Sequence, residues 1–128
     1  MSFLAKLELD GELHSLLDCS FAFNQPVDEN NKPSGRTQGG QIDVTIELAQ
    51  HLDILDWVVQ SRMTKEGQVI FYKQDSLSRQ LALKFQEAFC THLTGNFHSY
   101  NDEPLKISFT ITAETLNFNE SVEHKNLW

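Results

Sequence analysis

The chain has 128 residues, of which 40% are hydrophobic, and it carries a formal net charge of −8. This length supports one domain with a real core, and the apolar content excludes an intrinsically disordered chain. The acidic balance argues against a nucleic-acid partner, because phosphate binding needs clustered Lys and Arg. No apolar run approaches the ~20 residues of a membrane-spanning helix. We therefore expect residues 1–128 to form a single domain without nucleic-acid binding or membrane insertion.

The first 24 residues predict two antiparallel strands. Residues 3–9 alternate between apolar and polar side chains, and Asp10-Gly11 is a dipeptide typical of a tight type I′ turn. Residues 1–10 also carry charge, so they lack the apolar core of a signal peptide. We therefore expect folding in the cytoplasm, and any export should use a route without a cleaved signal. The returning strand is expected to share one apolar face, made of Leu13, Leu17, Cys19, Phe21 and Phe23. Its other face is expected to hold His14, Asp18, Ser20 and Asn24.

Residues 26–40 form a long polar loop in the sequence. Structureless loops of this length are uncommon in compact domains and are usually functional or disordered. Two readings stay open at this point: a surface excursion, or a segment that becomes ordered against a partner. Gly39 and Gly40 supply backbone freedom where the chain enters the next strand.

Residues 39–73 read as a strand, the only convincing helix, and a second strand, and the rest of the chain is organised around them. The strand over 41–48 should bury its four apolar side chains. The helix should begin at Asp53 as its cap, place Trp57 at the boundary of its apolar side, and end near Arg62 and Lys65. Its apolar side comprises Leu52, Ile54, Leu55, Val58 and Val59. The strand over 68–73 is apolar on both faces, so the helix or another subunit should cover the second face.

The last third predicts two long strands, over 81–93 and 105–113, and a short polar tail over 119–128 that docks through Trp128. The inward residues of the first strand are expected to be Leu81, Leu83, Phe85, Phe89 and Leu93, interrupted by Glu87, and those of the second Leu105, Ile107, Phe109, Ile111 and Ala113. Leu116 and Phe118 fall out of phase, which indicates a bulge or a strand end. Six strands and one helix predict a mainly β fold, a small antiparallel β barrel or curved sandwich with the helix packed against it. Its core should include Leu55, Trp57, Phe71 and Phe109.

No motif in the sequence carries catalytic chemistry. The five histidines are scattered, and the nearest metal candidate, His92 with His98, flanks a glycine loop without a zinc-binding pattern. Cys19 and Cys90 are far apart, and they are either free buried thiols or a cross-strand disulfide. No phosphate loop, nucleophile elbow or ordered triad is present. We therefore expect no enzymatic activity, no cofactor and no metal.

Several segments, taken in order, resemble one family. They are the opening residues 2–11, Gly39-Gly40 with the alternating strand that follows, residues 55–58 around Trp57, Phe71-Tyr72-Lys73 with Asp75, Phe85 and Ala88, residues 104–113, and the ending 123–128. Together they are similar to the tube proteins of type VI secretion systems, the haemolysin-coregulated proteins or TssD. Gln38 departs from the basic residue expected before the glycine pair, and Arg36 is its candidate substitute.

The resemblance implies a fold like that of phage tail-tube proteins and hexameric rings that stack into a hollow tube. A contractile sheath would drive the tube out of the cell with a spike and effectors, and no catalysis is implied. If the chain forms such rings, an interface within a ring or between stacked rings should include Arg36, Thr37, Gln38, Gly39 and Gly40. We expect the contact between rings, because the loop over 26–40 is too polar for a core and long for the connection it makes. The alternatives are a small β-barrel ligand carrier and a hydrolase with an unrecognised site.

Overall fold

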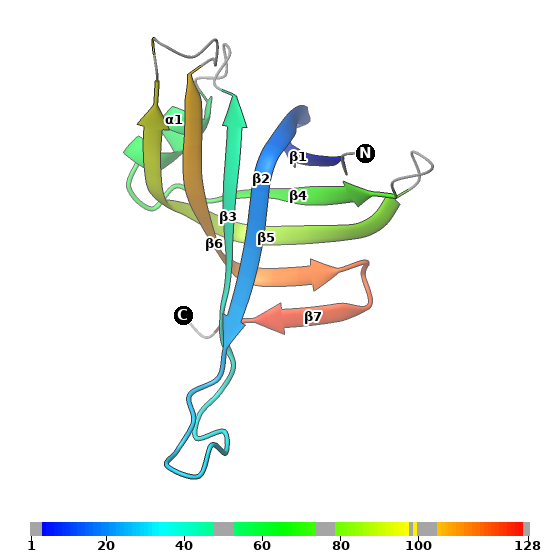
Figure 1. The fold of residues 1–128 in the computed structure, drawn as a ribbon, viewed down its shortest axis with the longest axis vertical. Helices are drawn as coiled ribbons and strands as arrows, with labels where there is room; N and C mark the ends of the chain where they lie inside the picture. The colour runs from blue at the N-terminus through cyan, green and yellow to red at the C-terminus, as the bar shows by residue number, and fades with distance from the viewer. Residues whose placement is uncertain (1–3, 48–52, 74–78, 98, 100–104, 127–128) are drawn as a thin grey trace.

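In the computed structural model, seven strands form one antiparallel sheet that closes on itself (Figure 1). The structure describes residues 4–47, 53–73, 79–97, 99 and 105–126. The strands are β1 (Ala5–Leu9), β2 (Glu12–Asn24), β3 (Gln38–Glu47), β4 (Lys65–Tyr72), β5 (Arg79–Asn96), β6 (Lys106–Phe118) and β7 (Val122–Lys125). Their order is β3-β2-β1-β4-β5-β6-β7, and the additional β3–β6 pairing closes a barrel of six strands with β7 outside it. The predicted antiparallel barrel is confirmed.

The β1–β2 hairpin turns at Asp10 and Gly11, whose φ angles are 53° and 82°. Both central residues of a type I′ turn need positive φ, so the predicted turn is confirmed. Leu7 and Leu9 are buried on the inner face of β1, as the alternation predicts.

The single apolar face expected for β2 is wrong. Leu13 and Leu17 are each 54% exposed, whereas His14 is only 6% exposed. The β2–β3 register shifts between Leu16 and Asp18, so one extra residue of β2 exchanges its inner and outer faces. Leu16 before the shift and Cys19 after it both pack against the core.

A similar change of phase occurs where β5 and β6 bend together (Figure 1). In β5, Phe85 and Ala88 are both buried, and Glu87 between them has a φ of 48°. The expected inward position of Phe89 is therefore wrong, since it is only half-buried. In β6, Leu116 is buried and the strand continues to Phe118, so the sequence slip marks this bend and no strand end. Leu105, expected inside, lies before β6 and is 38% exposed.

The helix α1 (Asp53–Val59) packs at one end of the barrel, next to β5. Trp57 is 1% exposed instead of lying at a boundary, and Val59 is 75% exposed instead of buried. The expected basic residues in the last turn are absent from α1, because Arg62 lies in the following turn and Lys65 begins β4. The predicted cap by the Asp53 side chain and the burial of Leu52 lie outside the described residues.

Trp57 and Phe109 lie in the hydrophobic core, with their rings 6.4 Å apart in an edge-on arrangement. Phe71 packs against this core, and Leu55 is half-buried. On β4 both Val69 and Ile70 are buried, although they point to opposite faces. The second face of β4 is therefore already covered at Ile70 within the single chain, without another subunit.

The tail expected over 119–128 contains the seventh strand instead. Asn119 and Glu120 have φ angles of 51° and 59°, so they reverse the chain after β6 and let β7 pair with it. Leu127 and the predicted docking of Trp128 lie outside the described residues. Within the described residues, no helix has the length and apolar character needed to cross a membrane.

Candidate assembly surfaces

Two strand segments of the barrel have a partner strand on one side only within the described residues. The pairing of β1 with β2 ends at Ser15, so residues 17–24 of β2 pair with β3 alone. The pairing of β4 with β5 ends at Ala88, so residues 89–96 of β5 pair with β6 alone. These open edges bound a four-stranded layer in the order β2, β3, β6, β5. Because every pairing is antiparallel, the two edges run in opposite directions.

The outer face of this layer is lined by short hydroxyl side chains that bond across the strands. The Thr110 hydroxyl donates to the Asp43 carboxylate at 2.6 Å, and the hydroxyls of Thr45 and Ser108 are 2.9 Å apart. The hydroxyls of Thr91 and Thr112 are 3.1 Å apart. A face built this way is polar and rigid, because short side chains held by hydrogen bonds have little rotamer freedom left.

An apolar surface adjoins the β2 edge. A groove of about 320 Å³ lies beside it, and its lining includes Leu4, Leu16, Leu17, Phe71 and Tyr72. Leu17 in this groove is more than half exposed. Farther along β2, the rings of Phe21 and Phe23 lie 5.7 and 5.9 Å from that of Phe118 and are still 41% and 37% exposed. Contiguous exposed apolar side chains of this kind mark interaction surfaces.

Residues 25–37 form an arm that projects from the barrel between β2 and β3 (Figure 1). The arm is not structureless: the Asp28 carboxylate accepts the amides of Asn30 and Lys32 at 2.8 and 3.0 Å, and the Ser34 amide donates to the Pro26 carbonyl at 2.7 Å. An Asp side chain that captures the amide two residues on builds a turn by itself. The arm is therefore a preformed projection whose side chains are nearly all exposed.

The predicted interface residues are divided between this arm and the strand after it. Arg36 is exposed on the arm, and Thr37 accepts a hydrogen bond of 2.6 Å from the Gln25 amide. Gln38, Gly39 and Gly40 lie inside β3, which begins three residues earlier than expected. Gly39 and Gly40 have φ angles of 108° and 74°, a conformation that glycine adopts without strain.

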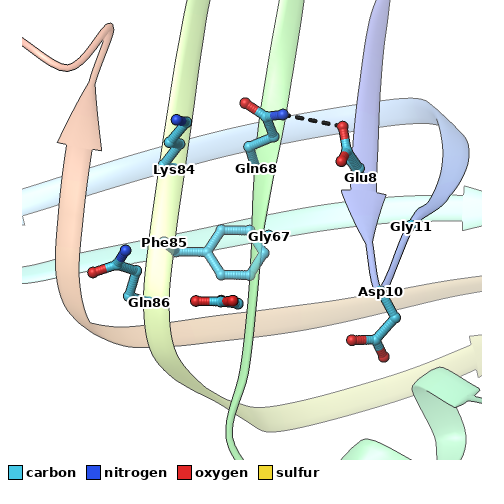
Figure 2. Close-up of a pocket in the computed structure, with 9 residues that line it drawn as sticks. Glu8, Asp10, Gly11, Gly67, Gln68, Lys84, Phe85 and Gln86 are labelled. Carbon is cyan, nitrogen blue, oxygen red and sulfur yellow. Dashed lines mark hydrogen bonds between the residues drawn. The ribbon is translucent and has the colours of Figure 1, made fainter.

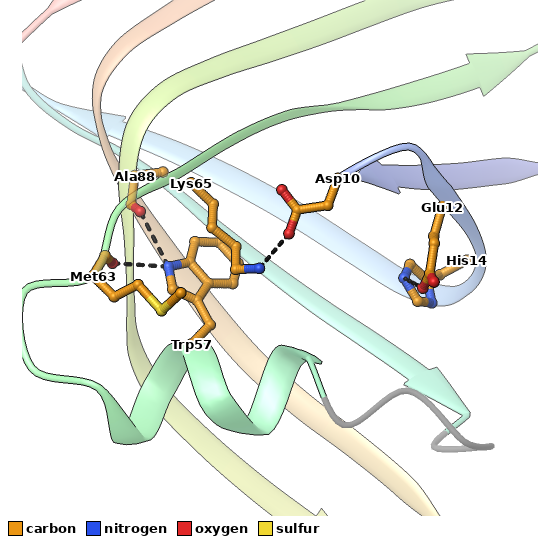
Figure 3. A network of polar contacts seen from close by, with 7 residues as sticks. All are labelled: Asp10, Glu12, His14, Trp57, Met63, Lys65 and Ala88. Carbon is orange, nitrogen blue, oxygen red and sulfur yellow. Dashed lines mark hydrogen bonds and ion pairs between the residues drawn. The ribbon is translucent and has the colours of Figure 1, made fainter.

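A polar groove of about 370 Å³ lies on β1, β4 and β5 (Figure 2). The Gln68 amide donates to the Glu8 carboxylate at 3.0 Å, and Lys84 and Asp10 also line the groove. Asp10 is ion-paired with Lys65 (Figure 3). This lining contains carboxylates, amides and a lysine but no Ser, Cys or His.

Of the two candidate metal ligands, the structure describes only His92. No group of three potential ligands occurs in the part of the chain that the structure describes. His92 is exposed on β5, and His98 lies outside the described residues. Cys19 and Cys90 are free thiols. Burial raises the pKa of both to about 11, and the carboxylates of Asp18 and Asp43 add to this effect at Cys19, so both thiols stay protonated at neutral pH.

These features define a class of protein. The barrel interior is occupied by buried side chains such as Leu7, Phe85 and Phe109, while the open edges, the arm and the exposed apolar groups face outward. Open strand edges beside exposed apolar side chains are typical of a subunit that assembles with further copies.

The chain belongs to the haemolysin-coregulated protein Hcp (TssD) family, whose model matches residues 1–128. Hcp1 from Flavobacterium johnsoniae is 30% identical, with a TM-score of 0.89 over 97% of this chain and 100% of that one. Hcp1 from Salmonella typhimurium shares the fold at 9% identity, with a TM-score of 0.73 over 92% and 86% of the two chains. No curated protein matches the chain.

A chain of a sheath–tube complex, from the extracellular contractile injection system PVC, has the same fold. It is 15% identical, with a TM-score of 0.58 over 95% of this chain and 88% of that one. Membership of the Hcp family makes this chain a tube subunit of a secretion apparatus, and the alternative of a ligand-carrying barrel is not favoured.

Proposed function

We propose that this chain closes into a six-membered ring by pairing the β5 edge of one copy with the β2 edge of the next. The support is the pair of open edges, residues 17–24 and 89–96, which are equally long and run in opposite directions. Side by side in neighbouring copies they extend the antiparallel sheet from subunit to subunit. The contact is heterologous, since two different surfaces meet, and such a contact makes a ring when its rotation closes.

The apolar surface beside the β2 edge supports the same arrangement. Leu17 and the groove with Phe71 lie next to this edge, so a neighbour that pairs there also covers apolar surface. Burial contributes roughly 25 cal/mol for each Å² of apolar surface removed from water. The hydroxyl-lined face then forms a continuous wall around the ring, which suits a hollow tube that carries effectors.

Proline substitutions on the β5 edge test ring closure. Neighbouring residues of an antiparallel edge strand point their N–H groups in opposite directions. Of Thr94→Pro and Gly95→Pro, one therefore removes a β6 hydrogen bond and the other a donor on the open edge. The variant that loses only the edge donor should keep the wild-type unfolding temperature. In native mass spectrometry we expect this variant to appear as a single chain of 14.7 kDa, whereas the wild type appears as a ring of six. If both variants keep the ring mass, edge pairing is wrong.

The arm is our candidate for the contact between stacked rings. It extends along the long axis of the subunit, beyond the barrel (Figure 1), and it presents Lys32 and Arg36 in an acidic protein. A cation on the arm meets carboxylates of the next ring with charge-assisted hydrogen bonds. Because the arm already has internal hydrogen bonds, its docking costs less ordering entropy than that of a loose loop.

Removal of residues 28–35 tests the stacking role. The Ser34 amide donates to the Pro26 carbonyl, so the two sides of the arm lie side by side near its base, and joining Val27 to Arg36 leaves a short path between β2 and β3. We expect intact rings, shorter tubes in electron micrographs and reduced secretion. Long tubes from the shortened protein would make the arm a surface excursion, and loss of rings would place its contact within one ring.

We further infer that the chain works as one domain, without catalysis, cofactor or metal, and that it leaves the cell without a cleaved signal. Its remaining partners on this proposal are the sheath, the spike and effector proteins. Elemental analysis of freshly purified protein tests the metal-free state: stoichiometric zinc or iron would contradict it and direct attention to His92 and His98.

A further inference from the structure

The base of the arm is joined to the C-terminal strand through one side chain, Asn126. Its side-chain nitrogen donates to the carbonyls of Gly39 on β3 and Ala113 on β6, both at 2.8 Å. Its backbone amide donates to the Glu114 carbonyl at 2.8 Å. Asn126 therefore connects three strands at the point where β3 leaves the barrel for the arm.

This connection replaces a missing strand pairing. The β3–β6 register begins at Gln41 and Thr112, so Gln38 and Gly39 lie beyond it and pair only with β2, and Gly40 lies at a register shift of that pairing. Here β6 bends away from β3 toward β7 (Figure 1), which leaves a gap in the strand pairing between β3 and β6. The Asn126 amide spans this gap, because one NH₂ group carries two donors and reaches a carbonyl on each side.

The surroundings hold Asn126 in this orientation. Both carbonyls are acceptors only, so the amide nitrogen faces them and the oxygen faces His124, whose Nε2 lies 3.0 Å away. Nε2 of His124 is thereby the donor. The His124 ring stands edge-on to Phe23 at 5.1 Å, and Phe23 lies in β2 opposite Gly39. Strand β7 and the residue after it therefore contact both sides of the base of the arm, through Phe23 on β2 and Gly39 on β3.

We propose that Asn126 is a positioning residue that fixes the direction of the arm relative to the barrel, so that β7 controls whether the arm can dock on the next ring. This inference rests on the proposed stacking role of the arm. Gly39 and Gly40 give the arm base a flexible backbone, and the Asn126 hydrogen bonds remove that freedom in the folded subunit. An arm that is already held in its docking direction loses less conformational entropy when it binds the next ring.

Asn126→Ala and Asn126→Asp test the proposal, with Gln68→Ala as the matched control. The side-chain amide of Gln68 on β4 donates to the Glu8 carboxylate at 3.0 Å, so its loss also removes a side-chain hydrogen bond, but away from the arm and from β7. Asn126→Asp keeps the shape of the side chain and turns a carboxylate oxygen toward the two carbonyls. If Asn126 acts by packing alone, its role survives this change. The two Asn126 side-chain hydrogen bonds to Gly39 and Ala113, which we call the latch, do not survive it.

Three measurements on the full chain give the outcome. We expect both Asn126 variants to keep the ring mass in native mass spectrometry and to form shorter tubes in electron micrographs. Hydrogen exchange at the amides of Gln38, Gly39 and Gly40 should be about tenfold faster, which is the effect of losing one hydrogen bond. Gln68→Ala should match the wild type in tubes and in this exchange. The latch would be overturned if both Asn126 variants formed tubes of wild-type length and exchanged these amides at the wild-type rate. It would also be overturned if the variants no longer formed rings. Absence of rings from the wild-type protein would instead overturn the proposed function, and the exchange result would still decide the latch.

Discussion

Glu87 and Glu114 face each other across β5 and β6, because the pairs Gln86–Thr115 and Ala88–Ala113 flank them. A hydrogen bond to Glu114 and the charge of Glu114 raise the pKa of Glu87 above its ordinary value of 4.5. The folded state therefore holds this proton more tightly than the unfolded state, so the pair destabilises the fold at neutral pH. Stability from this pair rises as pH falls through the raised pKa.

Glu114→Gln should for this reason be more stable than the wild type at pH 7. The advantage should shrink as pH falls from 7 toward 4.5, since the wild-type pair then gains its own proton. Thermal unfolding of both proteins across this range measures the difference, which isolates the pair from the other carboxylates. A pH-independent difference would contradict the predicted coupling.

Trp57 stabilises the fold through volume and through its indole N–H, which donates to the carbonyls of Met63 at 3.0 Å and Ala88 at 3.2 Å (Figure 3). Trp57→Ala removes both contributions and should cost roughly 3–5 kcal/mol of unfolding free energy. Trp57→Phe keeps most of the ring packing but leaves the Ala88 carbonyl without its donor, for a smaller cost of about 1–3 kcal/mol. Denaturant titration measures both, and equal costs would show that the ring volume kept by Phe contributes nothing, so that the lost N–H hydrogen bonds carry the whole effect.

At the scale of elements, the entry of β3 depends on glycine at position 40. A Cβ built there lies 2.1 Å from Cδ1 of Leu116, and the φ of 74° strains any other residue. Gly40→Ala should therefore cost roughly 2–4 kcal/mol, from backbone strain and overpacking together. Gly95→Ala is the matched control in another strand, because its Cβ meets nothing closer than 3.9 Å. Equal unfolding free energies for the two variants would contradict this account.

At the scale of the molecule, assembly brings together copies that each carry a net charge of −8. Like charges repel across the growing ring, and the Debye length falls from about 30 Å at 0.01 M salt to about 8 Å at 0.15 M. The fraction of subunits in rings should therefore rise over this range at a fixed protein concentration. Light scattering at several concentrations measures it. Dissociation on adding salt would show that attraction between charges, and not edge pairing with apolar burial, dominates the contact.

The sequence by itself determined the features that depend on neighbouring residues. The Asp10-Gly11 turn, the buried faces of β1 and β3 and the antiparallel barrel class all follow from a period of two and from local turn chemistry. The ordered series of short matching segments also led to the Hcp family, which the family model and the Flavobacterium structure show.

Only the tertiary structure decided the features that arise from barrel closure. The register shift after Leu16 and the bend at Glu87 exchange the faces of β2 and β5, because strands that serve two sheets must turn between them. Trp57 becomes buried because its N–H finds carbonyls 6 and 31 residues away. Asn126 donates to both β3 and β6 because these two strands no longer pair with each other at this point. A single sequence carries no signal for such contacts, because their partners meet only when the sheet closes.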